Sequence, residues 1–488
     1  MRIVTVISDL HLGGRFGHGD DRGFRMMTRP DALAAYIRSL ARGSELVING
    51  DFVDFLAEEG VEGAGWTPFV ADQAAVVERL ATLMGAPLAA GEAPPAGRSP
   101  DALVFDALAD HLTAGGELTL LLGNHDLELG LPAARGAVVE RLGPGGGRTR
   151  FVLDGEAYLV GDALIEHGNR YDGFNVVNQD AFRQLRSLLS RGHWPADAQR
   201  ISAFEAPLGS QLVAGIMNPV KRELAFVDLL KPEGPGLYAL LLALRPGLLG
   251  KLKQIAVFKY QARGREPTGA LPPEAGLRGE GVMRSGGGGG DVWQLLRDEG
   301  FDPGLVREVR GALEPGAEAT RGVGTRSLDD EATPGVGTRS LDDEAPGLVE
   351  RLKLKLIRAA LHRDDLQGIW DPAVESALAY AVAAGELADR GFRYLVFGHT
   401  HLARDITLPG GARYLNSGTW ANLMGFPPGI ELATDAGLAA FVADLEANRL
   451  AGYERFEPHA VELIVEGDRV SAARLVEPAE ILAASKKK

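Results

Sequence analysis

The chain has 488 residues and no cysteine. Thiolate catalysis, disulfides and cysteine-ligated zinc or iron sites are therefore excluded, and any metal must be held by histidine, asparagine or carboxylate side chains. Long apolar runs are also lacking. The longest one, 237–244, ends at Arg245 and is much shorter than the ~18 residues that indicate a membrane-spanning helix. The N-terminal sequence MRIVTVISDLHLGG has no signal-peptide pattern. We therefore expect a cytoplasmic protein.

Positive charge is scarce as well, since 51 Lys and Arg against 66 Asp and Glu give a formal net charge of -15. An acidic surface repels a phosphate backbone, so wrapping around nucleic acid is disfavoured, although a local basic patch stays open. Hydrophobic residues at 45% and charged residues at 24% are typical of a globular protein. The length predicts either one catalytic domain with a large insertion or two domains.

Short apolar runs that end in polar clusters occur in both terminal parts of the chain. Such runs predict buried strands, and 31–43 has the apolar spacing of a helix. The runs are 3–7 before Ser8 and Asp9, 46–48 before Asn49 and Asp51, 118–122 before Gly123 and Asn124, the hairpin 158–165 before His167, and 394–397 before Gly398 and His399. We predict an α/β sandwich with its site along one edge of the sheets.

The polar clusters read, in order, DLH, GDFVD, GNHD, EHG and GHTH. Each alone is weak evidence, because Asp and His at strand ends often only cap or hydrogen-bond. Together they suggest one chemistry. Two divalent cations about 3.5–4 Å apart can activate water and stabilise an in-line phosphoryl displacement. Without thiolates, such cations need hard oxygens, imidazoles and one carboxylate that bridges them.

In all five motifs and in their order, the chain resembles the calcineurin-like metallophosphoesterase superfamily. The resemblance implies an α/β fold, a four-layer αββα sandwich of two mixed sheets, with its core in 1–170 and 392–480. A large, mainly helical insertion or lid would occupy 171–391, and a tail 481–488. Within the insertion, Gly286 to Gly290 and two copies of GVGTRSLDDEA predict a disordered linker at about 284–346.

The resemblance also implies site roles, residue by residue. Asp51 would bridge two metals, and His125 would contact the scissile phosphate or protonate the leaving oxygen. The other implied ligands are Asp9, His11 and His401 for one metal and Asn124, His167 and His399 for the other. We expect two divalent ions, manganese first, although iron, zinc or cobalt also suit this set of ligands.

Two further residues have alternative interpretations. Asp54 matches the carboxylate that orients the catalytic histidine in relatives with GDxxD, but it also suits a helix cap. Arg170, three residues after His167, can make a bidentate contact to a substrate phosphate or form a surface salt bridge.

The resemblance defines the reaction type better than the substrate. UDP-2,3-diacylglucosamine hydrolases carry a helical lid at the position of this insertion, and EHGN, GHTH and NSGTW resemble that branch. Those enzymes usually have Arg where this chain has His125, and their lid is shorter. Segment 237–265 has six basic residues and no acidic one. It forms either a basic apolar surface for lipid-linked substrates, with peripheral contact to the inner membrane face, or amphipathic lid helices that pack on each other.

We therefore expect a metal-dependent hydrolase of phosphoester or phosphoanhydride bonds whose substrate is small or lipid-linked. One alternative is a nuclease, which needs a basic track towards the metals. Another is a catalytically silent metal-binding scaffold for a partner protein, which would be expected to have lost ligands or the leaving-group histidine. Here every such position is filled.

Overall fold

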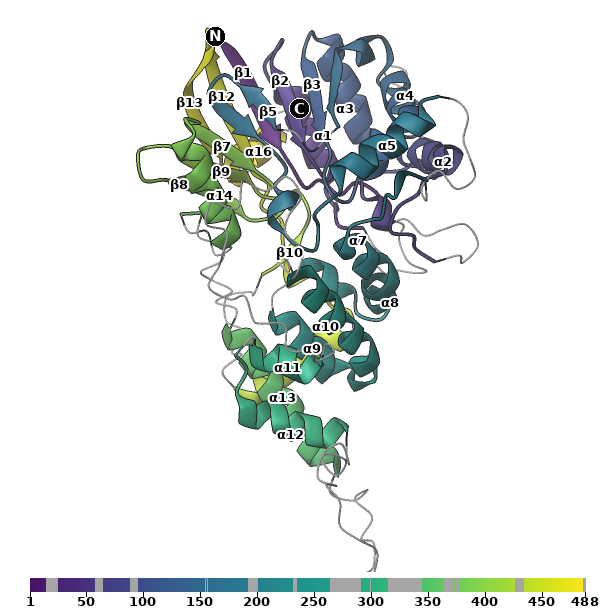
Figure 1. The fold of residues 1–488 in the computed structure, drawn as a ribbon, viewed down its shortest axis with the longest axis vertical. Coiled ribbons are helices and arrows are strands. Elements are labelled where there is room, and N and C mark those ends of the chain that lie inside the picture. Colours follow the sequence, from purple (N-terminus) through teal and green to yellow (C-terminus); the bar gives the residue numbers. More distant parts are fainter. Residues whose placement is uncertain are drawn as a thin grey trace, which may run out of the picture.

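The computed structural model describes residues 1–14, 25–57, 65–87, 95–153, 155, 157–191, 201–230, 235–263, 291–298, 300–314, 345–363, 372–373, 375, 378–425 and 434–485. Within these ranges the chain is an α/β protein with two mixed sheets and many helices. Figure 1 shows two parts, the sheets with their covering helices and an elongated lobe of helices beside them.

The first sheet has six strands in the order β13-β12-β1-β2-β3-β4. Strands β1 to β4 are parallel, while β12 pairs antiparallel with both β1 and β13. Their bounds are β1 (Arg2–Ile7), β2 (Glu45–Asn49), β3 (Glu117–Leu121), β4 (Thr149–Val152), β12 (Ala460–Glu466) and β13 (Arg469–Val476). The predicted strand, helix, strand unit at the N-terminus is confirmed.

The second sheet has five strands in the order β5-β6-β7-β9-β8. Its central strands β6, β7 and β9 are parallel, and each edge strand is antiparallel to its neighbour. The bounds are β5 (Tyr158–Val160), β6 (Ala163–Ile165), β7 (Tyr394–Phe397), β8 (Ala403–Thr407) and β9 (Arg413–Ser417). A separate short pair joins β10 (Leu423–Met424) to β11 (Glu454–Arg455).

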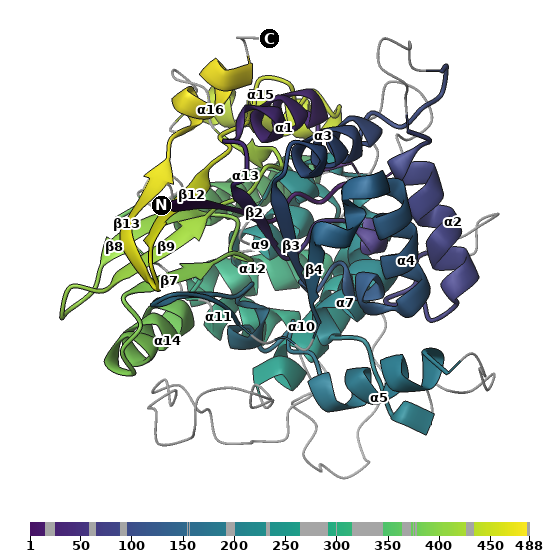
Figure 2. The same ribbon diagram turned by 90° about the horizontal axis from the view of Figure 1, so that it is seen from above.

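The two sheets face each other across a buried apolar layer. Side chains alternate along a strand, so Val47 of β2 points into this layer while Leu46 and Ile48 point to the opposite face. The layer includes Val4, Val6 and Leu121 from the first sheet and Ile165, Val396 and Leu415 from the second. Helices lie on the outer faces (Figure 2), an arrangement compatible with a sandwich.

The outer face of the first sheet is covered by several helices, and that of the second by α14. Helix α1 begins at Pro30, whose fixed φ suits a first helical turn, and buries Leu33, Tyr36 and Ile37 on one face. The helices are α1 (Pro30–Ser39), α2 (Gln73–Met84), α3 (Ala102–Thr113), α4 (Pro132–Arg141), α5 (Gln179–Leu189), α14 (Leu378–Asp389) and α16 (Pro478–Ser485).

The lobe has its own hydrophobic core and, within its described ranges, consists of helices. They are α7 (Leu208–Leu212), α8 (Asn218–Lys221), α9 (Pro235–Leu244), α10 (Leu249–Arg263), α11 (Val292–Asp298), α12 (Pro303–Leu313), α13 (Ala345–Arg363) and α15 (Asp435–Glu446). In α10 the apolar residues Leu252 and Ile255 are buried in this core, so the described part of the basic segment packs within the lobe. None of the described helices has the length and apolar character needed to cross a membrane.

The packing differs from the predicted boundaries in three ways. Residues 291–314, predicted as linker, form α11 and α12, because Trp293 and Leu296 bury in the lobe core. Helix α14 packs on the second sheet rather than in the insertion, and α15 packs in the lobe rather than on the sandwich. The predicted tail is helical to 485, since Ile481 is buried. The glycine run and the 13-residue repeat lie outside the described residues.

Candidate metal centre

The predicted ligands gather at one edge of the two sheets. Parallel strands bring their carboxyl ends to the same edge. Here Asp9 and His11 follow β1, Asp51 follows β2, Asn124 follows β3, His167 follows β6, and His399 and His401 follow β7. Side chains from five strands, separated by up to several hundred residues, therefore converge.

One group consists of Asp9, His11 and His401, which are all buried and offer ligand atoms within 4.8 Å of one another. The Nε2 atoms of His11 and His401 lie 3.1 Å apart, and His401 Nε2 lies 3.3 Å from Asp9 Oδ1. Two imidazole nitrogens and a carboxylate oxygen that approach so closely can hold a divalent cation.

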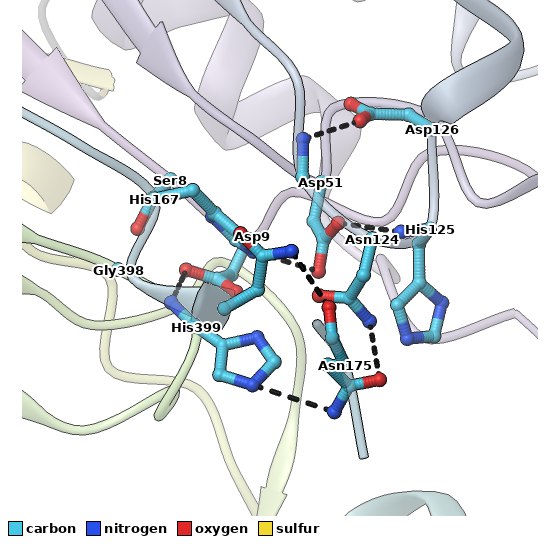
Figure 3. Close-up of polar contacts among 12 residues, drawn as sticks. Ser8, Asp9, Asp51, Asn124, His125, Asp126, His167, Asn175, Gly398 and His399 are labelled. Carbon is cyan, nitrogen blue, oxygen red and sulfur yellow. Dashed lines mark hydrogen bonds and ion pairs between the residues drawn. The ribbon is translucent and has the colours of Figure 1, made fainter. Parts of the chain in front are cut away.

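A second group consists of Asp51, His167 and His399, with the same limit of 4.8 Å. Asp51 Oδ2 lies 3.3 Å from His167 Nε2 and 3.9 Å from His11 Nε2 in the first group. The other oxygen, Oδ1, accepts from the His125 backbone N–H at 2.8 Å. Asp51 is thus the carboxylate that lies between the groups, and Figure 3 shows its bond to His125.

Three of the four candidate ligand histidines have one ring nitrogen held by an acceptor of the protein. His11 Nδ1 lies 3.1 Å from Asp54 Oδ2 and His167 Nδ1 lies 2.8 Å from the Asn49 carbonyl. His399 Nε2 lies 3.1 Å from Asp172 Oδ2. An acceptor on one nitrogen leaves the lone pair of the other for a metal, which is how metal-binding histidines are usually oriented.

Several ligand atoms have no hydrogen bond among the described residues. Asp9 Oδ1, Asn124 Oδ1 and His167 Nε2 are buried in this way. The Asn124 amide donates through Nδ2 to Asn175 Oδ1 at 3.1 Å, so its oxygen is turned away from this partner. Unsatisfied buried polar atoms are costly, and a cation would satisfy all three. The buried His and Asp groups therefore fit a metal ion.

The backbone around the ligands is strained. Seven non-glycine residues of the described chain have positive φ, and five of them are candidate ligands, namely Asp9 (54°), His11 (45°), Asp51 (50°), His399 (68°) and His401 (62°). Such a conformation costs on the order of 1–3 kcal/mol per residue and concentrates at functional sites.

Glycine precedes three of the ligands because nothing larger fits. A Cβ on Gly50 would lie 2.3 Å from His167 Nδ1, and one on Gly123 would lie 2.1 Å from Asp51 Oδ1. A Cβ on Gly398 would lie 2.9 Å from Asp9 Oδ2. The glycines of GD, GN and GH thus let backbone approach the ligand side chains closely.

The charges of the site compete with its burial. Burial disfavours the charged form of Asp51, but His167 and His125 together lower the pKa of Asp51 well below its usual value. Burial also acts against a charged His167, yet the carboxylates of Asp51 and Asp9 raise its pKa to about 10. Burial, supported by the charge of Asp51, raises the pKa of Asp9. A cation that binds here must displace protons.

His125 lies beside the first group and is held by Asp54. Its Nδ1 lies 3.0 Å from Asp54 Oδ1, which also accepts from the Ala57 backbone N–H at 3.0 Å. Asp54 thus contacts His125 and also caps the short 3-10 helix η1 (Phe55–Ala57), so both interpretations of Asp54 stay open. Its bond to His11 was not foreseen. Burial opposes its charge, but His125 and His11 lower the pKa of Asp54 well below the usual value.

Two residues that contact candidate ligands, Asp172 and Asn175, are not predicted from the sequence. Asp172 contacts His399 and Asn175 contacts Asn124, but both lie in a loop that has no strand end to mark it.

Arg170 donates to the Gly155 carbonyl, and its Nε lies 3.5 Å from Glu166. These contacts favour the salt-bridge interpretation of Arg170.

Comparison of the sequence with protein-family models and with curated proteins found no match.

Proposed function

We propose that the chain is a dinuclear metal-dependent hydrolase of phosphoester or phosphoanhydride bonds, built on the calcineurin-like metallophosphoesterase fold. The observation that carries the proposal is the pair of ligand groups with Asp51 between them, 3.3 Å from His167 Nε2 and 3.9 Å from His11 Nε2. Support for a four-layer αββα sandwich comes from the two facing sheets with helices on their outer faces.

In this proposal each ligand group holds one divalent cation, manganese in the first instance. Asp9, His11 and His401 would hold one ion, and His167 and His399 would hold the other with Asn124, whose buried Oδ1 has no hydrogen bond within the described part of the chain. Asp51 would serve both, because it lies between the two groups. When bound, the two cations supply the positive charge that activates water and stabilises the phosphoryl oxygens.

His125 is the residue that we propose contacts the phosphate and protonates the leaving oxygen. Its Nδ1 lies 3.0 Å from Asp54 Oδ1, and this contact holds the ring in one orientation. An imidazole that carries a proton at this edge can bind a phosphate oxygen and donate that proton to the leaving oxygen.

The substrate we propose is small or lipid-linked. The net charge of -15 disfavours a long nucleic acid. The branch that resembles the UDP-2,3-diacylglucosamine hydrolases remains our proposal for the substrate class, with a cytoplasmic enzyme and peripheral membrane contact through the lobe.

The test is a substrate panel with metal-stripped and manganese-loaded protein. We would assay bis-p-nitrophenyl phosphate, p-nitrophenyl phosphate, UDP-diacylglucosamine and single-stranded DNA. His125→Ala should lower turnover by about 10²–10⁴-fold, whereas His111→Ala, which removes a buried histidine outside both ligand groups, should retain it. If no substrate turned over despite two bound ions, the catalytic proposal would be wrong and a partner-binding scaffold would replace it.

A further inference from the structure

A tight turn follows the EHG motif and the short 3-10 helix η5 (Asn169–Tyr171). Within it, Asp172 Oδ1 accepts from the Phe174 N–H at 2.9 Å, and Asn175 Nδ2 donates to Asp172 Oδ2 at 2.7 Å. Asn169 Nδ2 donates to the Asn175 carbonyl at 2.9 Å. These bonds hold the side chains of Asp172 and Asn175 in fixed positions relative to each other.

This turn contacts two ligands of the same proposed metal position. Asp172 Oδ2 lies 3.1 Å from His399 Nε2. Asn175 Oδ1 accepts from Asn124 Nδ2 at 3.1 Å, as Figure 3 shows. A carboxylate only accepts, so the shorter contact, to Asp172, favours the His399 tautomer with its proton on Nε2 and its lone pair on Nδ1, although Asn175 Nδ2 also lies 3.5 Å from Nε2. The Asn124 amide is likewise oriented, because its nitrogen is bound and its oxygen remains for a cation.

Helix α7 of the lobe also contacts the turn. Gly209, in the first turn of α7, donates its backbone N–H to the Phe174 carbonyl at 2.7 Å. A Cβ on Gly209 would lie only 2.1 Å from Asn175 Oδ1. Ser210 Oγ, the next residue, lies 3.5 Å from the Asn124 carbonyl. Helix α7 thus packs directly on the groups that orient Asn124.

We propose that the turn 172–175, braced by α7, positions His399 and Asn124, so that the lobe sets the affinity of one of the two metal positions. Asp172 and Asn175 are positioning residues rather than metal ligands. The inference rests on the metal centre of the proposed function, but it concerns metal binding and does not depend on which bond is hydrolysed.

Gly209→Ala tests this from outside the site. The φ of Gly209 lies outside the left-handed region, and alanine favours a helix, so the variant should fold. Its methyl group must nevertheless displace the Asn175 amide. Gly215→Ala is the matched control, because Gly215 lies in the adjoining helical turn Val213–Met217 with nothing within 4 Å of a Cβ.

The measurement is a manganese titration of the metal-stripped full chain by calorimetry, with electron paramagnetic resonance of the loaded protein. Wild type and Gly215→Ala should bind two ions that are magnetically coupled. Gly209→Ala and Asp172→Ala should bind one ion with wild-type affinity and the other about 10–100-fold more weakly, with an uncoupled spectrum at one equivalent. Thermal melting without metal checks that each variant folds.

Two tightly bound, coupled ions in both variants would overturn the inference and leave the proposed function intact. If Asp172→Ala does not fold, Gly209→Ala decides alone. Wild-type protein that binds two ions but hydrolyses nothing would refute the proposed function without touching this inference. Wild-type protein that binds no ion would overturn both.

Discussion

Substitution of Asp54 by asparagine should weaken metal binding through His11 and should leave the hydrogen bond to His125 in place. Asp54 is almost fully buried and serves three donors. Its Oδ1 lies 3.0 Å from His125 Nδ1 and 3.0 Å from the Ala57 nitrogen, while its Oδ2 lies 3.1 Å from His11 Nδ1. Because the carboxylate is ionised, His11 carries its proton on Nδ1 and presents a lone pair on Nε2.

In Asp54→Asn the amide oxygen should remain at the Oδ1 position, where two donors meet it. The amide NH2 then faces His11 Nδ1, which has to accept instead of donate. The proton of His11 therefore moves to Nε2, the atom that lies 3.1 Å from His401 Nε2 in the ligand group. Loss of such an orienting partner lowers metal affinity about 10–100-fold.

The assay is hydrolysis of bis-p-nitrophenyl phosphate as a function of manganese concentration. Asp54→Asn should need about 10–100-fold more manganese for half-maximal activity and should approach the wild-type rate at saturation. His125→Ala should instead lose about 10²–10⁴-fold in kcat at every manganese concentration. An unchanged manganese requirement in Asp54→Asn, or a rate that manganese cannot restore, would refute this reasoning.

Three further predictions concern packing, pH and Arg170. Gly123→Ala would place a Cβ 2.1 Å from Asp51 Oδ1 and 2.5 Å from its backbone nitrogen, so the free energy of unfolding should fall by about 1–3 kcal/mol. Gly136→Ala, with nothing within 4 Å in α4, should raise it by up to about 1 kcal/mol, and thermal melts that rank them oppositely would contradict the packing. Since the pKa of His167 is raised to about 10 in the folded, metal-free protein, its contribution to stability is complete below pH 6.5 and is lost as the pH rises towards 10. A cation must expel this proton, so manganese affinity by calorimetry should rise up to about tenfold per pH unit in that window, and a flat profile would argue against the assignment. Arg170→Ala should lower the free energy of unfolding, because it leaves the buried Glu166 carboxyl without this partner, and should leave KM unaltered in steady-state assays, unlike a substrate ligand.

The strands and the ligand positions could be predicted because both have strong local signals. Short continuous apolar runs indicate strands that are buried on both faces, such as β2, and the carboxyl end of each parallel strand indicates where Asp51 and the other candidate ligands lie. Which layer an amphipathic helix covers has no such signal. Helix α14 lies in the predicted insertion and α15 in the predicted core, yet α14 packs on the second sheet and α15 packs in the lobe.

The rest depends on contacts between distant segments. Asp172 and Asn175 are polar loop residues, and only folding brings them to His399, more than two hundred residues away. The positive φ of five ligands is also set by tertiary packing, since Asp and His by themselves favour negative φ. Residues 291–314 fall within the predicted linker because a glycine run precedes them and the 13-residue repeat follows them, although Trp293 and Leu296 supply an apolar face.

The most direct test of the central claim is to titrate manganese into metal-stripped protein while following both bound metal and hydrolysis of bis-p-nitrophenyl phosphate. A two-metal hydrolase predicts little turnover at one bound ion per chain and full turnover as the second binds. Turnover that is complete without metal or with a single ion, or no turnover with two ions bound, would contradict it.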